Sequence, residues 1–130
     1  MRLLLGSLLI VSLFAIGCSD SAGAGSPAMS SDGTNLEARY PTGVAVVYFY
    51  STTCASCKAQ NAQNPEIAAA LDPLGVTFAK INPNGTTIRR YNLTRFPTIV
   101  VLHNGAIIKR WTGVVYKEDI MPVVRSALGR

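Results

Sequence analysis

The sequence predicts an α/β domain in which helices cover both faces of a mixed four-stranded β-sheet. Three observations support this fold class. Runs of β-branched and aromatic residues alternate with Ala-rich segments, as strands alternate with helices in α/β proteins. Strands joined through helices pair in parallel, and an Asn-Gly dipeptide joins the last two runs as an antiparallel hairpin. The expected order is strand 44–50, helix 55–71, strand 76–81, helix 86–91, strand 98–103, strand 106–112 and a C-terminal helix.

The first residues are typical of an exported protein. Met1 and Arg2 precede a mostly apolar run, Leu3 to Ile16. This run is shorter than the roughly 20 residues that a membrane-spanning helix needs, but it has the length of a signal-peptide core. We therefore expect residues 1–17 to be a signal peptide.

A cysteine follows the apolar run directly. Ala15-Ile16-Gly17-Cys18 resembles the lipobox of bacterial lipoproteins, in which small residues precede a cysteine that is acylated, although Leu is usual where Ala15 stands. We expect Cys18 to carry a lipid on the periplasmic side of a bacterial membrane, and Ser19 in the next position favours the outer membrane. The alternative is ordinary cleavage after Ala22-Gly23-Ala24, which would release a soluble periplasmic protein.

A segment rich in Ser, Ala and Gly separates this cysteine from the domain. Residues 18–35 cannot bury enough apolar surface to offset their ordering entropy, so we expect the lipidated cysteine to be followed by a flexible linker. Residues 36–130 form the domain and contain eleven Lys and Arg against five Asp and Glu, a net charge of +6. We interpret this surplus as a solvated basic surface, with acidic partners or an anionic membrane as the alternative. Nucleic acid is not an expected partner of an exported protein.

The domain begins with a buried strand and a long helix. Residues 44–50 (VAVVYFY) are β-branched and aromatic almost throughout, as expected of a strand buried on both faces, and a fifth short strand could precede them. Residues 55–71 are rich in Ala and Gln and predict a helix that Asp72-Pro73 ends. We expect an interruption inside this helix, because Asn64 can cap and Pro65 can open a second helical segment.

The remaining elements are shorter. Residues 76–81 predict a second strand, and residues 86–91 predict a short helix. Asn104-Gly105 is a strong two-residue hairpin signal between the last two strands. In the final segment, apolar side chains share one helical face: Ile120, Val123, Val124, Ala127 and Leu128. Asp119 is the expected N-cap of this helix, because Pro122 then lies in its first turn.

Two cysteines at a spacing of three carry the candidate chemistry. Cys54 follows the buried strand and opens the predicted helix, where unpaired backbone N–H groups and the helix dipole stabilise a thiolate. Cys57 lies one turn further on and can close a disulfide with Cys54. The pair predicts an exchange in which Cys54 attacks a partner sulfur and Cys57 resolves the mixed disulfide. Zinc and copper sites use the same spacing, so a metal-binding or metal-delivery module and a redox-silent binding module remain alternatives.

Four segments lie in a characteristic order around and after this pair. They are VVYFYSTTCASCK at the cysteines, AKIN at the end of the next strand, FPT at 96–98 and HNGAIIKRWTG in the hairpin. Together they resemble the thioredoxin family over residues 44–128. The resemblance implies a thioredoxin-like fold for residues 36–130 and an enzyme that exchanges disulfides with exported proteins, without a cofactor beyond the Cys54–Cys57 disulfide. It implies an upstream thiol reductant or oxidant as a second partner.

The resemblance also assigns roles to residues outside the pair. In the family the proline of FPT is cis and packs beside the disulfide, which makes Phe96 and Pro97 the substrate-docking element. Many members place a buried acid, accompanied by a lysine, beneath the resolving cysteine; here Tyr48 and Lys80 stand at those positions as candidate helpers. A phenol with a pKa near 10 is a poor base, so we interpret Tyr48 as a core aromatic whose hydroxyl is satisfied.

Two further departures concern redox direction and the N-terminus. Ala55-Ser56 is neither the Gly-Pro of cytosolic reductants nor the His-containing pair of strong oxidants, and the lack of a histidine there favours the reductase direction. Residues 19–43 are too few for the full N-terminal strand and helix of thioredoxins, which we expect to be reduced or absent.

Other polar residues are weaker candidates. His103 is the only histidine and is expected at the hairpin, away from the cysteines, so we interpret it as a solvated turn residue and predict no metal site. Arg89, Arg90 and Arg95 precede the docking segment and are interpreted as solvated surface. We expect a monomer.

Overall fold

The computed structural model describes residues 35–130. The predictions for the signal peptide, Cys18 and most of the linker lie outside the described residues. Within residues 35–130, no helix is both long enough and apolar enough to cross a membrane.

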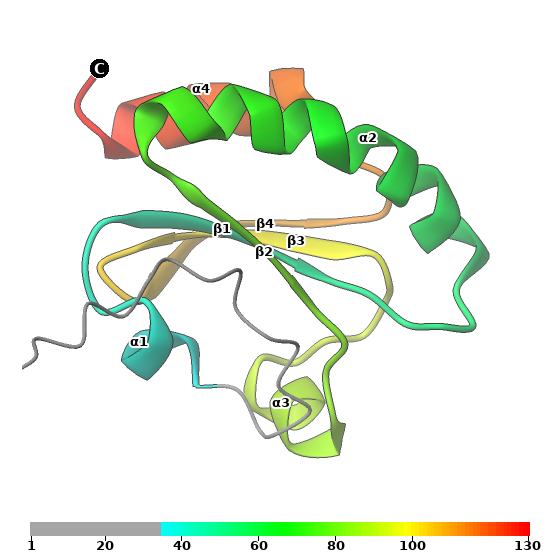
Figure 1. Ribbon diagram of the computed structural model, residues 1–130. Coiled ribbons are helices and arrows are strands. Elements are labelled where there is room, and N and C mark those ends of the chain that lie inside the picture. The colour runs from blue at the N-terminus through cyan, green and yellow to red at the C-terminus, as the bar shows by residue number, and fades with distance from the viewer. Residues whose placement is uncertain (1–34) are drawn as a thin grey trace, which may run out of the picture.

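The sheet is mixed and four-stranded, as predicted, with the order β2-β1-β3-β4 (Figure 1). Its centre is β1 (Val44–Phe49), which pairs in parallel with β2 (Thr77–Ile81) and antiparallel with β3 (Thr98–His103). The second edge is β4 (Ala106–Thr112), joined to β3 by a two-residue turn in which Asn104 and Gly105 both have positive φ. Left-handed conformations at both positions give the turn a twist that matches the strands, and Asn and Gly tolerate them best.

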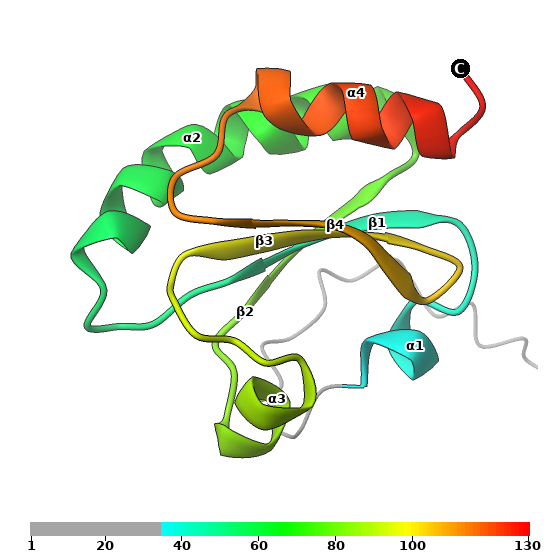
Figure 2. The same ribbon diagram turned by 180° about the vertical axis from the view of Figure 1, so that it is seen from behind.

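Helices cover both faces of this sheet. One face carries α2 (Ala55–Leu71) and α4 (Lys117–Ala127), and the other carries α1 (Leu36–Arg39) and α3 (Gly85–Arg90), as Figures 1 and 2 show. A single 3-10 turn, Asp72–Leu74, follows α2. The fold class is therefore confirmed, with boundaries that differ from those expected by one residue in several elements. Between residue 35 and β1 the structure contains α1 and no further strand.

Alternate residues of β1 feed two separate hydrophobic cores. All six residues of β1 are buried. Successive side chains of a strand point to opposite faces, and helices cover both faces of this sheet. Val46 and Tyr48 pack with α2 and α4, whereas Val47 and Phe49 pack with α1 and the residues after α3. Packing on both faces holds the C-terminal end of β1 in place, and the short segment 50–53 connects this end to the cysteine pair.

The predicted interruption of the long helix is wrong. α2 continues through Pro65, and its buried residues are Cys57, Gln60, Asn64, Ile67 and Leu71. Asn64 caps nothing; its side chain lies in the buried face and accepts a hydrogen bond from Gln60 Nε2 at 3.1 Å. Pro65 removes one backbone donor, but breaking the helix there would expose Ile67 and Leu71, both fully buried. Burial of two such side chains, each contributing about 1.5–3 kcal/mol, offsets the cost of about 3 kcal/mol that a proline inside a helix carries.

The predicted start of the last helix is also wrong. α4 begins at Lys117 and Tyr116 is its N-cap, with the backbone N–H of Tyr116 donating to Asp119 Oδ2 at 3.1 Å. Asp119 therefore supports the first turn from inside the helix, and Pro122 lies beyond that turn. The buried face of α4 against the sheet keeps the helix continuous across Pro122: Ile120, Met121 and Val124.

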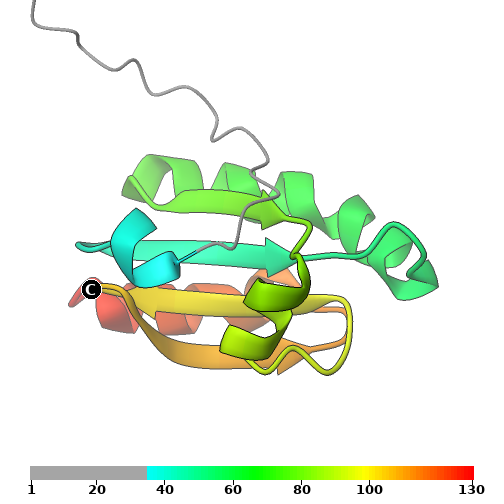
Figure 3. The ribbon, with the colours of Figure 1, turned by 90° about the horizontal axis from the view of Figure 1, so that it is seen from below.

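Hydrogen bonds to the hydroxyl of Tyr91 hold α1 against the rest of the domain. The fully buried Leu36 donates its backbone N–H to Tyr91 Oη at 2.7 Å, and Tyr91 Oη donates to Glu37 Oε2 at 2.9 Å. α1 also lies against the β3–β4 turn, where a Cβ on Gly105 would meet Glu37 Cα at 3.2 Å. Figure 3 shows α1 and α3 on the same face of the sheet.

Removing this hydroxyl is expected to destabilise the domain. Tyr91→Phe leaves the buried N–H of Leu36 without an acceptor, so we expect the free energy of unfolding to fall by about 1–3 kcal/mol in urea denaturation. Glu37→Ala is the control, because it removes an exposed acceptor and leaves the Leu36 bond in place; its effect should stay below about 1 kcal/mol. Equal losses in the two variants would contradict the assigned role of the Leu36–Tyr91 bond.

Candidate active site at the first turn of α2

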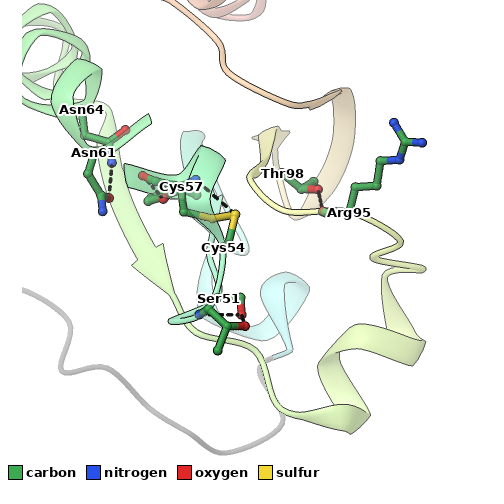
Figure 4. Close-up of a disulfide and its surroundings, with 9 residues drawn as sticks. Ser51, Cys54, Cys57, Asn61, Asn64, Arg95 and Thr98 are labelled. Atoms are coloured by element: carbon green, nitrogen blue, oxygen red, sulfur yellow. Dashed lines mark hydrogen bonds between the residues drawn. A yellow bond between two sulfur atoms is a disulfide. The ribbon is translucent and has the colours of Figure 1, made fainter. Parts of the chain in front are cut away.

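The two cysteines lie at the junction of β1 and α2. Cys54 is the N-cap of α2, and its Sγ accepts a hydrogen bond from the backbone N–H of Cys57 at 3.1 Å. A disulfide joins the two residues, whose Cα atoms are 5.3 Å apart (Figure 4). Cys57 is 2% exposed, whereas Cys54 is only partly buried. An incoming sulfur can therefore reach Cys54 more readily than Cys57.

The position of Cys54 favours a negative charge on sulfur. The first N–H groups of a helix have no intrahelical acceptor and carry the positive end of the helix dipole. The first turn of α2 contains no acidic residue, and Lys58 follows Cys57. In the reduced protein the N–H groups of this turn, among them the Cys57 N–H that faces Cys54 Sγ, stabilise a thiolate at Cys54, which is the nucleophilic form of cysteine.

The FPT segment lies next to this junction. Thr98, the first residue of β3, pairs with Phe49, the last residue of β1. The Phe96–Pro97 peptide bond is cis, as the family resemblance implied. Thr98 Oγ1 donates to the carbonyl of Arg95 at 2.6 Å, which closes the turn that carries Phe96 and Pro97. In Figure 4 this turn, labelled at Arg95 and Thr98, lies across from the disulfide.

Tyr48 lies beneath Cys57 as a neutral phenol. It is fully buried, and its hydroxyl donates to the carbonyl oxygen of Cys57 at 3.2 Å, which confirms its interpretation as a core aromatic with a satisfied hydroxyl. Burial, with a smaller contribution from Tyr50, raises the pKa of Tyr48 to about 12. The Nζ of Lys80 lies 5.9 Å from the ring centre of Tyr48 and 5.6 Å from that of Tyr50. No Asp or Glu of residues 35–130 is buried, so within that range no other carboxylate replaces the acid that many family members carry beneath the resolving cysteine.

Tyr48 is therefore expected not to act as a base. Tyr48→Phe should keep the rate of disulfide exchange within about threefold and leave its pH profile between pH 5 and 9 unshifted, as measured with a small disulfide reagent. A shift of the profile in this variant would contradict the neutral role of the phenol.

The same variant changes alkaline stability in a defined direction. The folded state raises the pKa of Tyr48 from 10.0 to about 12, so the unfolded chain releases this proton first. The corresponding stability is fully present below pH 10.0 and is lost progressively as the pH rises to about 12. Wild type should therefore lose more stability than Tyr48→Phe over this interval in urea titrations.

Sequence reasoning missed two residues that organise the site. Gln60, one turn after Cys57, is fully buried, and Gly113 donates its N–H to the carbonyl of Pro97 at 2.9 Å. A signal for Gln60 was present, because Gln60 and Asn64 fall on the same helical stripe as Ile67 and Leu71. Polar side chains in an apolar stripe are usually paired with other groups.

The remaining candidates lie away from the cysteines or at the rim. His103 ends β3 at the turn opposite the cysteine end of the sheet, and residues 35–130 contain no group of three His, Cys, Asp or Glu that could hold a metal ion. Arg89 and Arg90 end α3 and are exposed, as predicted, and the exposed Arg95 flanks Phe96 directly.

Comparison with known proteins identifies this arrangement. The thioredoxin family model matches residues 34–126. The chain belongs to the thioredoxin family. A thioredoxin of Mycoplasma genitalium is 35% identical over 84 residues, covering 62% of this chain and 79% of the relative. A thioredoxin of Staphylococcus saprophyticus is 24% identical over 96 residues, covering 73% of this chain and 92% of the relative.

Solved thioredoxin structures share the fold. Fasciola hepatica thioredoxin aligns with a TM-score of 0.59 at 21% identity, covering 71% of this chain and 88% of the other. Chloroplastic thioredoxin z aligns with a TM-score of 0.60 at 23% identity, covering 73% and 86%. With the family and the Cys54–Cys57 disulfide both in place, the protein is a thiol–disulfide oxidoreductase.

Proposed function

We propose that this protein reduces disulfides in exported proteins, with Cys54 as the attacking sulfur and Cys57 as the resolving sulfur. The observation that carries the proposal is the asymmetry of the pair. Cys54 is partly exposed as the N-cap of a 17-residue helix, and Cys57, in the first turn of that helix, is 2% exposed. One sulfur is therefore open to a partner, and the other is held for the second step.

The reaction balances in two exchanges. The Cys54 thiolate attacks a sulfur of the substrate disulfide, the substrate S–S bond breaks, and the released thiolate takes up a proton. Cys57 then loses its proton and attacks Cys54 Sγ, which frees the second substrate thiol. The substrate gains two electrons and two protons, and the protein retains the Cys54–Cys57 disulfide. An upstream dithiol donor restores the reduced pair by the reverse sequence.

The docking element for the substrate is the segment Phe96–Pro97. Phe96 is half-buried and Pro97 is buried at the start of β3, beside the end of β1 that leads to Cys54. An extended substrate segment lying along this turn would bring its disulfide to Cys54. The exposed Arg95 adds a positive charge at the edge of the same turn.

The reductase direction and the location outside the cytoplasm rest on sequence. Ala55-Ser56 offers no histidine to stabilise the reduced pair, which favours a reducing potential. The apolar N-terminal run and Cys18 support export and a lipid anchor, with the outer membrane favoured. A reduction potential of about −270 mV would support the reductase direction, and one of about −120 mV would overturn it. Wild type should take up palmitate label that Cys18→Ala loses; a wild type without label would overturn the lipid anchor, and label that persists in Cys18→Ala would overturn Cys18 as its site.

Trapping tests the protein-substrate role directly. Full-length Cys57→Ser, expressed in a Gram-negative host, should accumulate mixed disulfides with exported proteins through Cys54, seen as bands that dithiothreitol removes. The Cys54→Ser and Cys57→Ser double variant is the control and should capture nothing. If Cys57→Ser reacts normally with a small disulfide yet captures no protein, the proposal fails. Stoichiometric tight uptake of copper(I) or zinc by the reduced wild type would favour the metal-binding alternative instead.

A further inference from the structure

A buried amide connects the helix of the cysteines to the neighbouring loop. Gln60 is fully buried on α2, one turn beyond Cys57. Its Oε1 accepts from the backbone N–H of Val115 at 2.7 Å, and its Nε2 donates to the carbonyl of Val115 at 3.1 Å. The same Nε2 donates to Asn64 Oδ1 at 3.1 Å. The side chain therefore pairs with both backbone groups of one residue, much as a neighbouring strand would.

The loop held by Gln60 also holds the docking turn. Val115 lies in the segment Gly113–Tyr116 between β4 and α4, where the ladder of the sheet has ended. Two residues before Val115, Gly113 donates its N–H to the carbonyl of Pro97 at 2.9 Å. Three hydrogen bonds thus connect Gln60 to Pro97 through the Gly113–Tyr116 loop. This path ties the turn at Pro97 to the helix that carries both sulfurs.

The loop presents apolar side chains beside the docking turn. Val115 is 2% exposed, whereas its neighbours Val114 and Tyr116 are 36% and 50% exposed. They are two of the three large apolar side chains that are exposed in residues 35–130. Val114 and Tyr116 therefore lie on the exposed side of a loop whose Val115 backbone is bonded to Gln60 and whose Gly113 is bonded to Pro97.

We propose that Gln60 is a positioning residue that sets the Gly113–Tyr116 loop and the Pro97 turn against the Cys54–Cys57 pair for binding of protein substrates. The inference rests on the proposed function, because it concerns docking of the same substrates. The hydrogen bonds of Gln60 go to Val115 and Asn64, and its side chain is fully buried, so it acts on docking through the loop. Its loss should weaken binding of a protein disulfide while the intrinsic reactivity of Cys54 stays unchanged.

The test compares two kinds of disulfide in one variant. Gln60→Met keeps the length of the side chain and removes its three hydrogen bonds. We expect the KM for insulin reduction, with dithiothreitol as the electron donor, to rise about tenfold. The reason is that the variant loses both hydrogen bonds that hold Val115, so the loop is no longer fixed in the position that binds substrate. The kcat and the rate with a small aromatic disulfide should stay within about twofold of wild type. Gln63→Met is the matched control, because Gln63 lies on the same helix and is only half-buried, and it should match wild type throughout.

The outcomes separate this inference from the proposed function. Equal losses on insulin and on the small disulfide, or an unchanged KM, would overturn the positioning role of Gln60. Failure of wild type itself to reduce insulin would instead count against the proposed function. If Gln60→Met does not fold, amide hydrogen exchange of the wild type decides: Val115 and Gly113 should be protected at least about a hundredfold over an unstructured chain. Unprotected exchange of the Val115 N–H would show that the side-chain amide of Gln60 does not hold the loop.

Discussion

Replacement of Cys54 by Ser is expected to abolish insulin reduction, with a loss on the order of a thousandfold or more, because a hydroxyl is a far weaker nucleophile than a thiolate at neutral pH. The fold should survive, since Cys54 is only partly buried and Ser is also an effective N-cap. The measurement is the initial rate of insulin reduction, with circular dichroism as the check on folding.

Cys57→Ser is the matched comparison, because it removes the other sulfur of the same disulfide. This variant should still react once with a small aromatic disulfide, releasing one equivalent of thiol, and then stop as a stable mixed disulfide on Cys54. The two variants should therefore differ in their first turnover although both fail in steady state. If Cys54→Ser gave the burst and Cys57→Ser did not, the roles of the two sulfurs would be reversed.

Truncation of the core beneath α2 should have the largest effect on stability. Ile67 is fully buried and belongs to the core formed by the sheet, α2 and α4, with Tyr48 and Ile120. Ile67→Ala should lower the free energy of unfolding by about 2–5 kcal/mol, through lost burial and the cavity left behind. Small domains have only about 5–15 kcal/mol in total, so the variant should unfold at much lower urea concentration.

Ile108→Ala provides the control for this truncation. Ile108 lies on the edge strand β4 and is 45% exposed, so the same change of side chain should cost less than about 1 kcal/mol. Comparable losses at the two positions would contradict the packing of α2 against the sheet. A larger loss of stability at Ile67 than at Ile108 would show that packing of Ile67 in the core stabilises α2 beyond Pro65.

Local patterns predicted much of the fold and the centre of the site. The buried strand at Val44, the turn at Asn104-Gly105 and the position of Cys54 at the start of a helix each depend on a few neighbouring residues. Because strand burial, turn conformation and helix capping are local properties, they can be read along the chain.

The errors and omissions involve contacts between distant segments. Pro65 and Pro122 both lie within helices, because packing against the sheet outweighs the local cost of proline. The Gln60–Val115 bonds join residues 55 positions apart, which no local pattern reports. A polar residue in an apolar stripe indicates that a partner exists, but only the tertiary structure identifies it.

The neutral phenol under Cys57 has a consequence for how long the protein stays attached to a partner. Because burial raises the pKa of Tyr48 to about 12, the phenol is neutral at physiological pH and accepts no proton, and we expect release of the covalent complex to depend on a proton acceptor from the solvent or the partner. Because the thiolate is the attacking form of Cys57, the dwell time of that complex should lengthen as the surroundings become more acidic. Acidification would therefore prolong the covalent attachment of the protein to its substrate.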